Sequence, residues 1–87
     1  MTTSQENILK IPYSDDILLA LKENKEEFEK EAKFLLALKL YELGKISSGK
    51  AAKIANLNRA DFLLKMGEYG VSPFQEDLQE IAKEASE

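Results

Sequence analysis

Apolar residues recur at helical spacing along most of this chain, and the longest such segment covers residues 26–43. Its first half has one apolar stripe through Phe28 and Ala32, whereas residues 34–43 (FLLALKLYEL) are apolar nearly all round. A helix of the second kind has to be covered on several sides. Gly44 supplies the left-handed residue that commonly follows a helix, so we expect the helix to end there.

A second pattern, at residues 46–67, predicts two short helices joined by a three-residue turn. Ser47 is a favourable N-cap for a helix over residues 48–55, and Asn56 tolerates the left-handed conformation that would end it. Asn58 is placed to cap the second helix. The inward face of that helix is expected to consist of Phe62, Leu63 and Met66. These are the parts of a helix-turn-helix, although many helical hairpins have the same parts and only pack.

The N-terminal part combines weaker signals. Residues 1–7 are polar and expected to be loose, and residues 8–13 (ILKIPY) have the composition of a short strand, which Pro12 would confine to a sheet edge. Because no second strand is apparent, this segment would pair with its copy in a dimer or lie as an extended arm. Residues 14–43 are expected to form two helices separated by a polar break. Ser14 would cap the first, whose apolar face consists of Ile17, Leu18 and Leu21.

The C-terminal segment predicts one amphipathic helix over residues 72–86. Ser72 and Pro73 form a strong helix start, and the residues that follow place one apolar stripe between acidic faces. The stripe consists of Phe74, Leu78, Ile81 and Ala85. It would either cover the protein's own core or be presented to a partner.

Composition narrows the range of functions. The 87 residues suffice for one small, mainly α-helical domain, and the 44% hydrophobic and 32% charged residues are ordinary for a globular protein. The chain contains neither cysteine nor histidine, so the usual nucleophiles and general bases are missing. We therefore expect no enzyme activity, no cofactor and no metal site. No apolar run is long enough to span a bilayer and no signal peptide is recognisable, which favours a cytoplasmic location.

Charge is distributed unevenly around the net value of −4. Residues 44–73 carry five cations against two acids, a net +3, whereas residues 74–87 carry one cation against five acids. The basic region coincides with the predicted helix-turn-helix, which favours DNA binding, although a surface of this charge is also ordinary for a solvated protein. Asn58 and Arg59 would contact base edges, because they begin the second helix. The predicted phosphate contacts are Lys50, Lys53 and Lys65.

The apolar helix at residues 34–43 also bears on assembly. A chain of this length has few elements with which to cover such a helix, so a second copy is the expected partner and a homodimer is predicted. A core helix within a monomer is the alternative.

Residues 32–73 resemble a family of small, uncharacterised prokaryotic proteins. The resemblance is carried by Leu40-Tyr41, Gly44-Lys45-Ile46-Ser47, Gly49-Lys50-Ala51-Ala52, Arg59, Phe62 and Tyr69-Gly70. Members of this family are commonly viewed as antitoxin-like and are often encoded beside a PIN-domain ribonuclease toxin. This sequence departs from the family pattern at Asn56 and Asn58, where the family favours Gly and Ser, but both asparagines preserve the turn and cap chemistry.

The resemblance implies an antitoxin that binds a PIN-type ribonuclease and that could bind its own operator DNA through the helix-turn-helix. The competing interpretation is a protein-interaction module or structural dimer without DNA contact. A PIN domain holds its metal with carboxylates, whereas the terminal helix offers only Lys83 among its acids. We therefore expect the stripe that begins at Phe74 to fit an apolar groove beside the active site rather than to plug the site.

Overall fold

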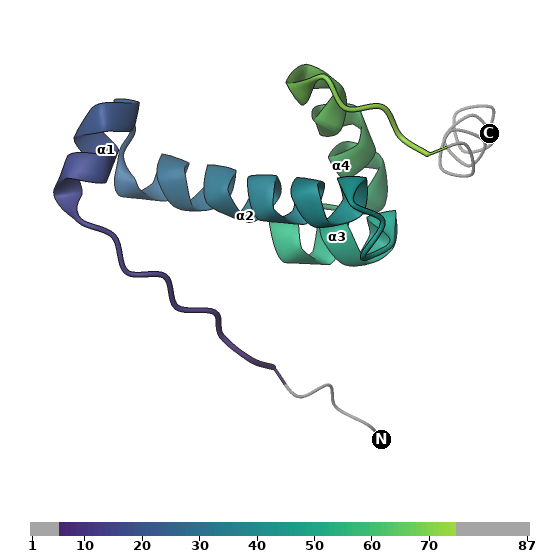
Figure 1. Ribbon diagram of the computed structural model, residues 1–87, viewed down its shortest axis with the longest axis horizontal. Coiled ribbons are helices and arrows are strands. Elements are labelled where there is room, and N and C mark those ends of the chain that lie inside the picture. The colour runs from purple at the N-terminus through teal and green to yellow at the C-terminus, as the bar shows by residue number, and fades with distance from the viewer. Residues whose placement is uncertain (1–5, 75–87) are drawn as a thin grey trace.

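The computed structural model describes residues 6–74, which form four α-helices and one 3₁₀ turn, and no strand within that range (Figure 1). The elements are α1 (Asp15–Leu21), α2 (Lys25–Glu42), α3 (Ser48–Ala55), α4 (Arg59–Met66) and η1 (Gly67–Tyr69). The mainly α fold predicted from the sequence is confirmed. α3 and α4 pack at the C-terminal half of α2, whereas α1 lies at the opposite end of that helix.

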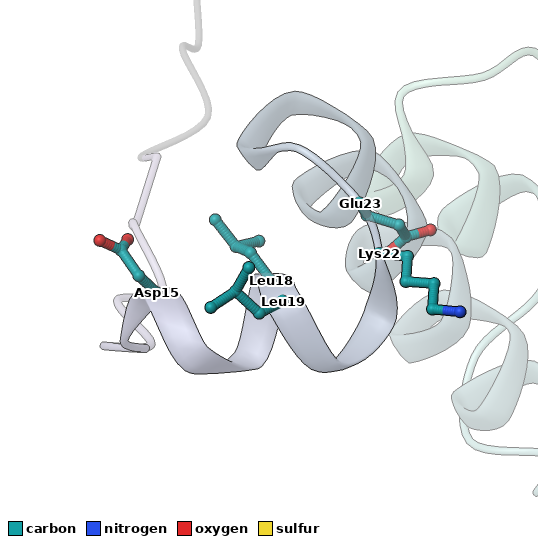
Figure 2. Close-up of a pocket in the computed structure, with 5 residues that line it drawn as sticks. All are labelled: Asp15, Leu18, Leu19, Lys22 and Glu23. Atoms are coloured by element: carbon teal, nitrogen blue, oxygen red, sulfur yellow. The ribbon is translucent and has the colours of Figure 1, made fainter.

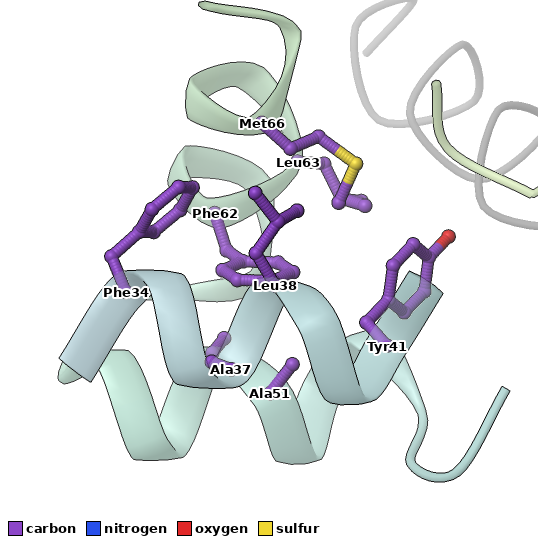
Figure 3. Close-up of a cluster of buried hydrophobic side chains, with 9 residues drawn as sticks. Phe34, Ala37, Leu38, Tyr41, Ala51, Phe62, Leu63 and Met66 are labelled. Carbon is purple, nitrogen blue, oxygen red and sulfur yellow. The ribbon is translucent and has the colours of Figure 1, made fainter. Parts of the chain in front are cut away.

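The core lies where α2, α3 and α4 meet (Figure 3). Phe34, Leu38 and Tyr41 project from one face of α2 toward α4. Ala37 and Ala51 are fully buried where α2 and α3 approach each other, since neither side chain extends beyond a methyl group. The other buried apolar side chains are Ala52, Phe62, Leu63 and Met66. The predicted inward face of the second hairpin helix is therefore confirmed.

α2, α3 and η1 are each followed by a residue of positive φ, whereas α4 runs into η1 through Gly67 with a right-handed helical backbone. Gly44, Asn56 and Gly70 have φ values of +75°, 59° and +75°. After α2, Lys45 N–H donates to Leu40 C=O at 2.9 Å and Gly44 N–H donates to Tyr41 C=O at 2.9 Å. This paired arrangement satisfies carbonyls that the end of a helix leaves free. The predicted roles of Gly44 and Asn56 as helix terminators are confirmed.

The polar break between α1 and α2 also contains a left-handed residue, Lys22, at φ 58°. α2 then begins one residue earlier than predicted. Asn24 accepts a hydrogen bond from Glu27 N–H at 2.8 Å, while Asn24 N–H donates to the Glu27 carboxylate at 2.9 Å. Asn24 is therefore the N-cap of α2, the longest helix, within a reciprocal capping box.

The predicted strand at residues 8–13 is not formed in the described structure. Residues 6–12 instead make an extended N-terminal arm that runs away from the helices, and residues 6–74 contain no strand with which it could form a ladder (Figure 1). The alternative of an arm is thus the one observed in the single chain. The arm is held at its base, where the Tyr13 ring meets the Phe28 ring at 4.8 Å and its hydroxyl donates to the Glu29 carboxylate at 2.5 Å.

Ser14 precedes α1 as predicted, but its hydroxyl does not cap the helix. The hydroxyl donates to the Asp16 carboxylate and accepts no backbone N–H. α1 has no buried residue, so neither core packing nor a side-chain cap stabilises this helix. Within residues 6–74, no helix is long and apolar enough to cross a membrane.

Candidate functional site

One of the two residues predicted to contact DNA bases joins the two helices of the helix-turn-helix. Arg59, the first residue of α4, donates from Nε to the hydroxyl of Ser48, the first residue of α3, at 2.8 Å. Ser48 is only 4% exposed, so this bond satisfies a buried hydroxyl and joins the N-terminal ends of the two helices. Arg59 therefore has a structural role that the sequence pattern did not indicate.

Asn58 is similarly engaged. Its side-chain oxygen accepts from Asp61 N–H at 2.8 Å, and its Nδ2 donates to the Asp61 carboxylate at 3.1 Å. The cap is the one predicted, and it occupies both polar atoms of the asparagine side chain. Both predicted base contacts, Asn58 and Arg59, thus stabilise the hairpin, and their contact with DNA stays a prediction.

The three predicted phosphate contacts are divided between two environments. Lys50 and Lys53 are exposed and lie one helical turn apart on α3, opposite the face that is buried by Ala51 and Ala52. Lys65 is half-buried, because its ammonium lies 5.0 Å from the centre of the Phe34 ring on α2. This cation–π contact turns Lys65 toward the core, away from a shared basic surface with the α3 lysines.

The outward face of α4 and η1 is acidic and apolar. Asp61, Leu64 and Glu68 follow one another at helical spacing and are all exposed, with Leu64 67% exposed. In a helix-turn-helix this face of the second helix is the one that enters the major groove. Two carboxylates there oppose contact with phosphates. The sequence spacing assigns these three residues to one face, but the net positive charge of residues 44–73 does not reveal that this face is acidic.

A second acidic group gathers where the α1–α2 junction faces η1. Burial is the main reason that the pKa of Glu23 is raised, and the side chain of Glu31 is the next. The Oε1 atom of Glu23 is enclosed and has no hydrogen-bond partner among residues 6–74. Burial followed by the charge of Glu31 raises the pKa of Tyr69. The Tyr69 ring packs 5.0 Å from Phe34, so it joins this acidic group to the core. No cluster of carboxylates with the arrangement of a metal site occurs within the described range.

Phe74 is the one residue of the predicted partner-binding stripe that the structure describes. Its ring stacks on Tyr41 at 4.4 Å, and its N–H donates to the Tyr41 hydroxyl at 2.7 Å. Phe74 nevertheless remains 42% exposed. The beginning of the stripe therefore packs on the protein's own core, while Leu78, Ile81 and Ala85 lie outside the described residues.

A shallow depression of about 580 Å³ lies along α1 and is lined by Asp15, Leu18, Leu19, Lys22 and Glu23 (Figure 2). It is open to solvent and its lining comes from one helix and the residues after it. Such a surface lacks the enclosure and convergent polar groups of a small-molecule site. It is better described as part of an exposed face of α1.

The described chain is thus a small helical protein built around a helix-turn-helix. A family model for an uncharacterised protein family, UPF0175, matches residues 5–87, and the chain belongs to this family. A UPF0175 protein of Archaeoglobus fulgidus is 42% identical over 59 residues, which are 68% of this chain and 67% of the relative. A UPF0175 protein of Aeropyrum pernix is 42% identical over 67 residues, which are 70% of this chain and 74% of the relative. No solved structure matches.

Proposed function

We propose that this protein is an antitoxin-like binding protein and that its main partner is a PIN-type ribonuclease toxin. The connection with such a toxin comes from the resemblance of residues 32–73 described above. The single observation that favours a protein partner is the outward face of α4 and η1, where exposed Leu64 lies between the carboxylates of Asp61 and Glu68.

This face has the chemistry needed to bind a ribonuclease. An enzyme that binds RNA presents cations along its substrate groove, because its substrate is a polyanion. Asp61 and Glu68 would orient such a surface, while burial of Leu64 would supply affinity. The acidic group around Glu23 and Glu31 extends the same sign of charge toward α1. A protein partner is therefore favoured over the major groove at this face.

Leu64→Lys is expected to weaken the complex with a PIN-domain ribonuclease encoded beside this protein by about tenfold or more. The substitution removes the exposed apolar side chain and places a cation against a cationic groove, but it leaves the core untouched. Co-purification and titration calorimetry measure the effect. Lys53→Ala, an exposed change on α3, is the matched control and should leave the affinity unchanged. Unaltered affinity of Leu64→Lys would remove α4 from the interface, and absence of any complex would contradict the proposal.

A second candidate function, operator binding, is favoured by a different observation. Lys50 and Lys53 are both exposed on one face of α3, and neither engages a carboxylate in the described structure. This face can contact phosphates without requiring α4 to enter the groove. DNA contact would then be dominated by the backbone rather than by base readout.

Lys50→Ala and Lys53→Ala are each expected to weaken binding to the protein's own upstream DNA for all sequences alike. In each variant the logarithm of affinity should fall less steeply with the logarithm of salt concentration, by about 0.9 in slope, since each substitution removes one phosphate contact. Gel-shift or anisotropy titrations over several salt concentrations measure this slope. Leu64→Lys should not weaken DNA binding, which separates the two functions. Arg59→Ala is not a clean test, because it also breaks the bond to Ser48. Absence of salt-sensitive binding at low salt would contradict operator binding.

A further inference from the structure

α2 is apolar on two opposite faces, of which the core covers only one. The core face carries Phe34, Ala37, Leu38 and Tyr41, all buried. At about 100° per residue, the opposite side of the helix carries a second set of apolar side chains. The apolar residues of this outer face of α2 are Ala32, Leu35, Leu36 and Leu43, of which the three leucines are exposed, and Lys39 lies among them.

The arm and α1 expose further apolar side chains beside the other end of α2. Ile8, Leu9 and Ile11 of the arm are between 64% and 81% exposed, and Leu19 of α1 is 77% exposed. The contacts of Tyr13 with Phe28 and Glu29 fix the base of the arm against α2. From there the arm extends away from its own helices, so its apolar side chains have no cover from residues 6–74 (Figure 1).

We propose that the outer face of α2, together with the arm, is the contact surface for a second copy of this chain. Each copy carries both an uncovered apolar helix face and an apolar extended arm. A two-fold arrangement therefore places the arm of each subunit against the α1–α2 surface of the other. The arm, about 3.3 Å long per residue, is comparable in reach with the 18-residue helix that it would cover.

Charge supports a second copy of the chain as the occupant of this surface. The chain has a net charge of −4, so most contacts between identical copies would be repulsive. Residues 34–43, in contrast, contain one lysine and one acid, Lys39 and Glu42, which form an ion pair at 3.3 Å. This part of α2 is neutral and apolar, so two copies can approach there without repulsion between like charges. The proposal does not depend on the toxin or DNA interactions discussed above.

The test is the mass in solution of the full chain and of matched variants, measured by light scattering and sedimentation equilibrium. The unaltered protein should be a dimer of about twice 9.8 kDa. Leu36→Glu should raise the dissociation constant about 100-fold, and Ile8→Asp combined with Ile11→Asp about tenfold, because each places charge in the apolar contact. Helical circular dichroism should be retained in both, since none of these side chains belongs to the core.

Leu64→Glu is the matched control, because Leu64 is an exposed leucine on α4, away from the proposed contact. Its dissociation constant should equal that of the unaltered protein. A monomeric unaltered protein at high micromolar concentration would overturn the proposal. A dimer whose dissociation constant is unchanged by the charges on α2 and on the arm would also overturn it, whatever the result for Leu64→Glu.

Discussion

Phe62→Ala is expected to lower the free energy of unfolding by about 3–5 kcal/mol. Phe62 is completely buried, and its ring lies 5.3 Å from that of Phe34 and 6.0 Å from that of Tyr41. It is thus the α4 side chain that contacts both buried aromatic residues of α2. Removing it leaves a cavity that small helices cannot fill without moving, and the total stability of such a domain is only about 5–15 kcal/mol. Thermal and urea unfolding measure the loss.

Leu64→Ala is the matched control for Phe62→Ala. It also shortens an apolar side chain of α4, but that side chain is exposed and its removal should change stability by no more than about 0.5 kcal/mol. A comparable loss of stability in the two variants would show that α4 does not pack through the face that Figure 3 places against α2.

Most of the hairpin backbone could be predicted from the sequence. Ser47, Asn56 and Asn58 each act through a hydrogen bond or a dihedral angle set within a few residues, so local chemistry suffices to predict them. The same holds for Phe62 and Met66, because helical spacing alone assigns them to one face. Local rules of this kind predicted the bounds of α3 and the start of α4.

The side-chain contacts of the candidate site could not be predicted from the sequence. Arg59 reaches Ser48 across 11 positions, and Lys65 reaches Phe34 across two helices, so both contacts depend on the angles at which helices pack. A count of cations cannot distinguish an exposed lysine from one that lies over an aromatic ring. Lys22 was missed for another reason, since a lysine in the left-handed conformation is uncommon, although here the local hydrogen bonds that end α1 hold it there.

Truncation after Gly70 is expected to lower the free energy of unfolding by about 2–4 kcal/mol, which corresponds to a fall in the melting temperature of roughly 10–25 °C. The truncation removes Val71, which is packed against the core, and Phe74, which is stacked on Tyr41. It also removes the donor that meets the Tyr41 hydroxyl. Truncation after Phe74 is the matched control, because it keeps all three contacts and deletes only residues 75–87. The melting temperature of each protein measures the difference.

The same pair of truncations separates the two roles considered for the C-terminal stripe. If the stripe binds the toxin, truncation after Phe74 should retain the fold but lose binding, since it deletes Leu78, Ile81 and Ala85 while leaving the contact of Phe74 with Tyr41 in place. If that protein still binds the toxin, the interface lies on the described surface, where Leu64 is the residue to test next. If truncation after Phe74 destabilises the fold as much as truncation after Gly70, the contacts of Val71 and Phe74 are not what residues 71–87 contribute to stability. Stability and toxin binding, measured on the same two proteins, therefore assign the segment to the core or to the interface.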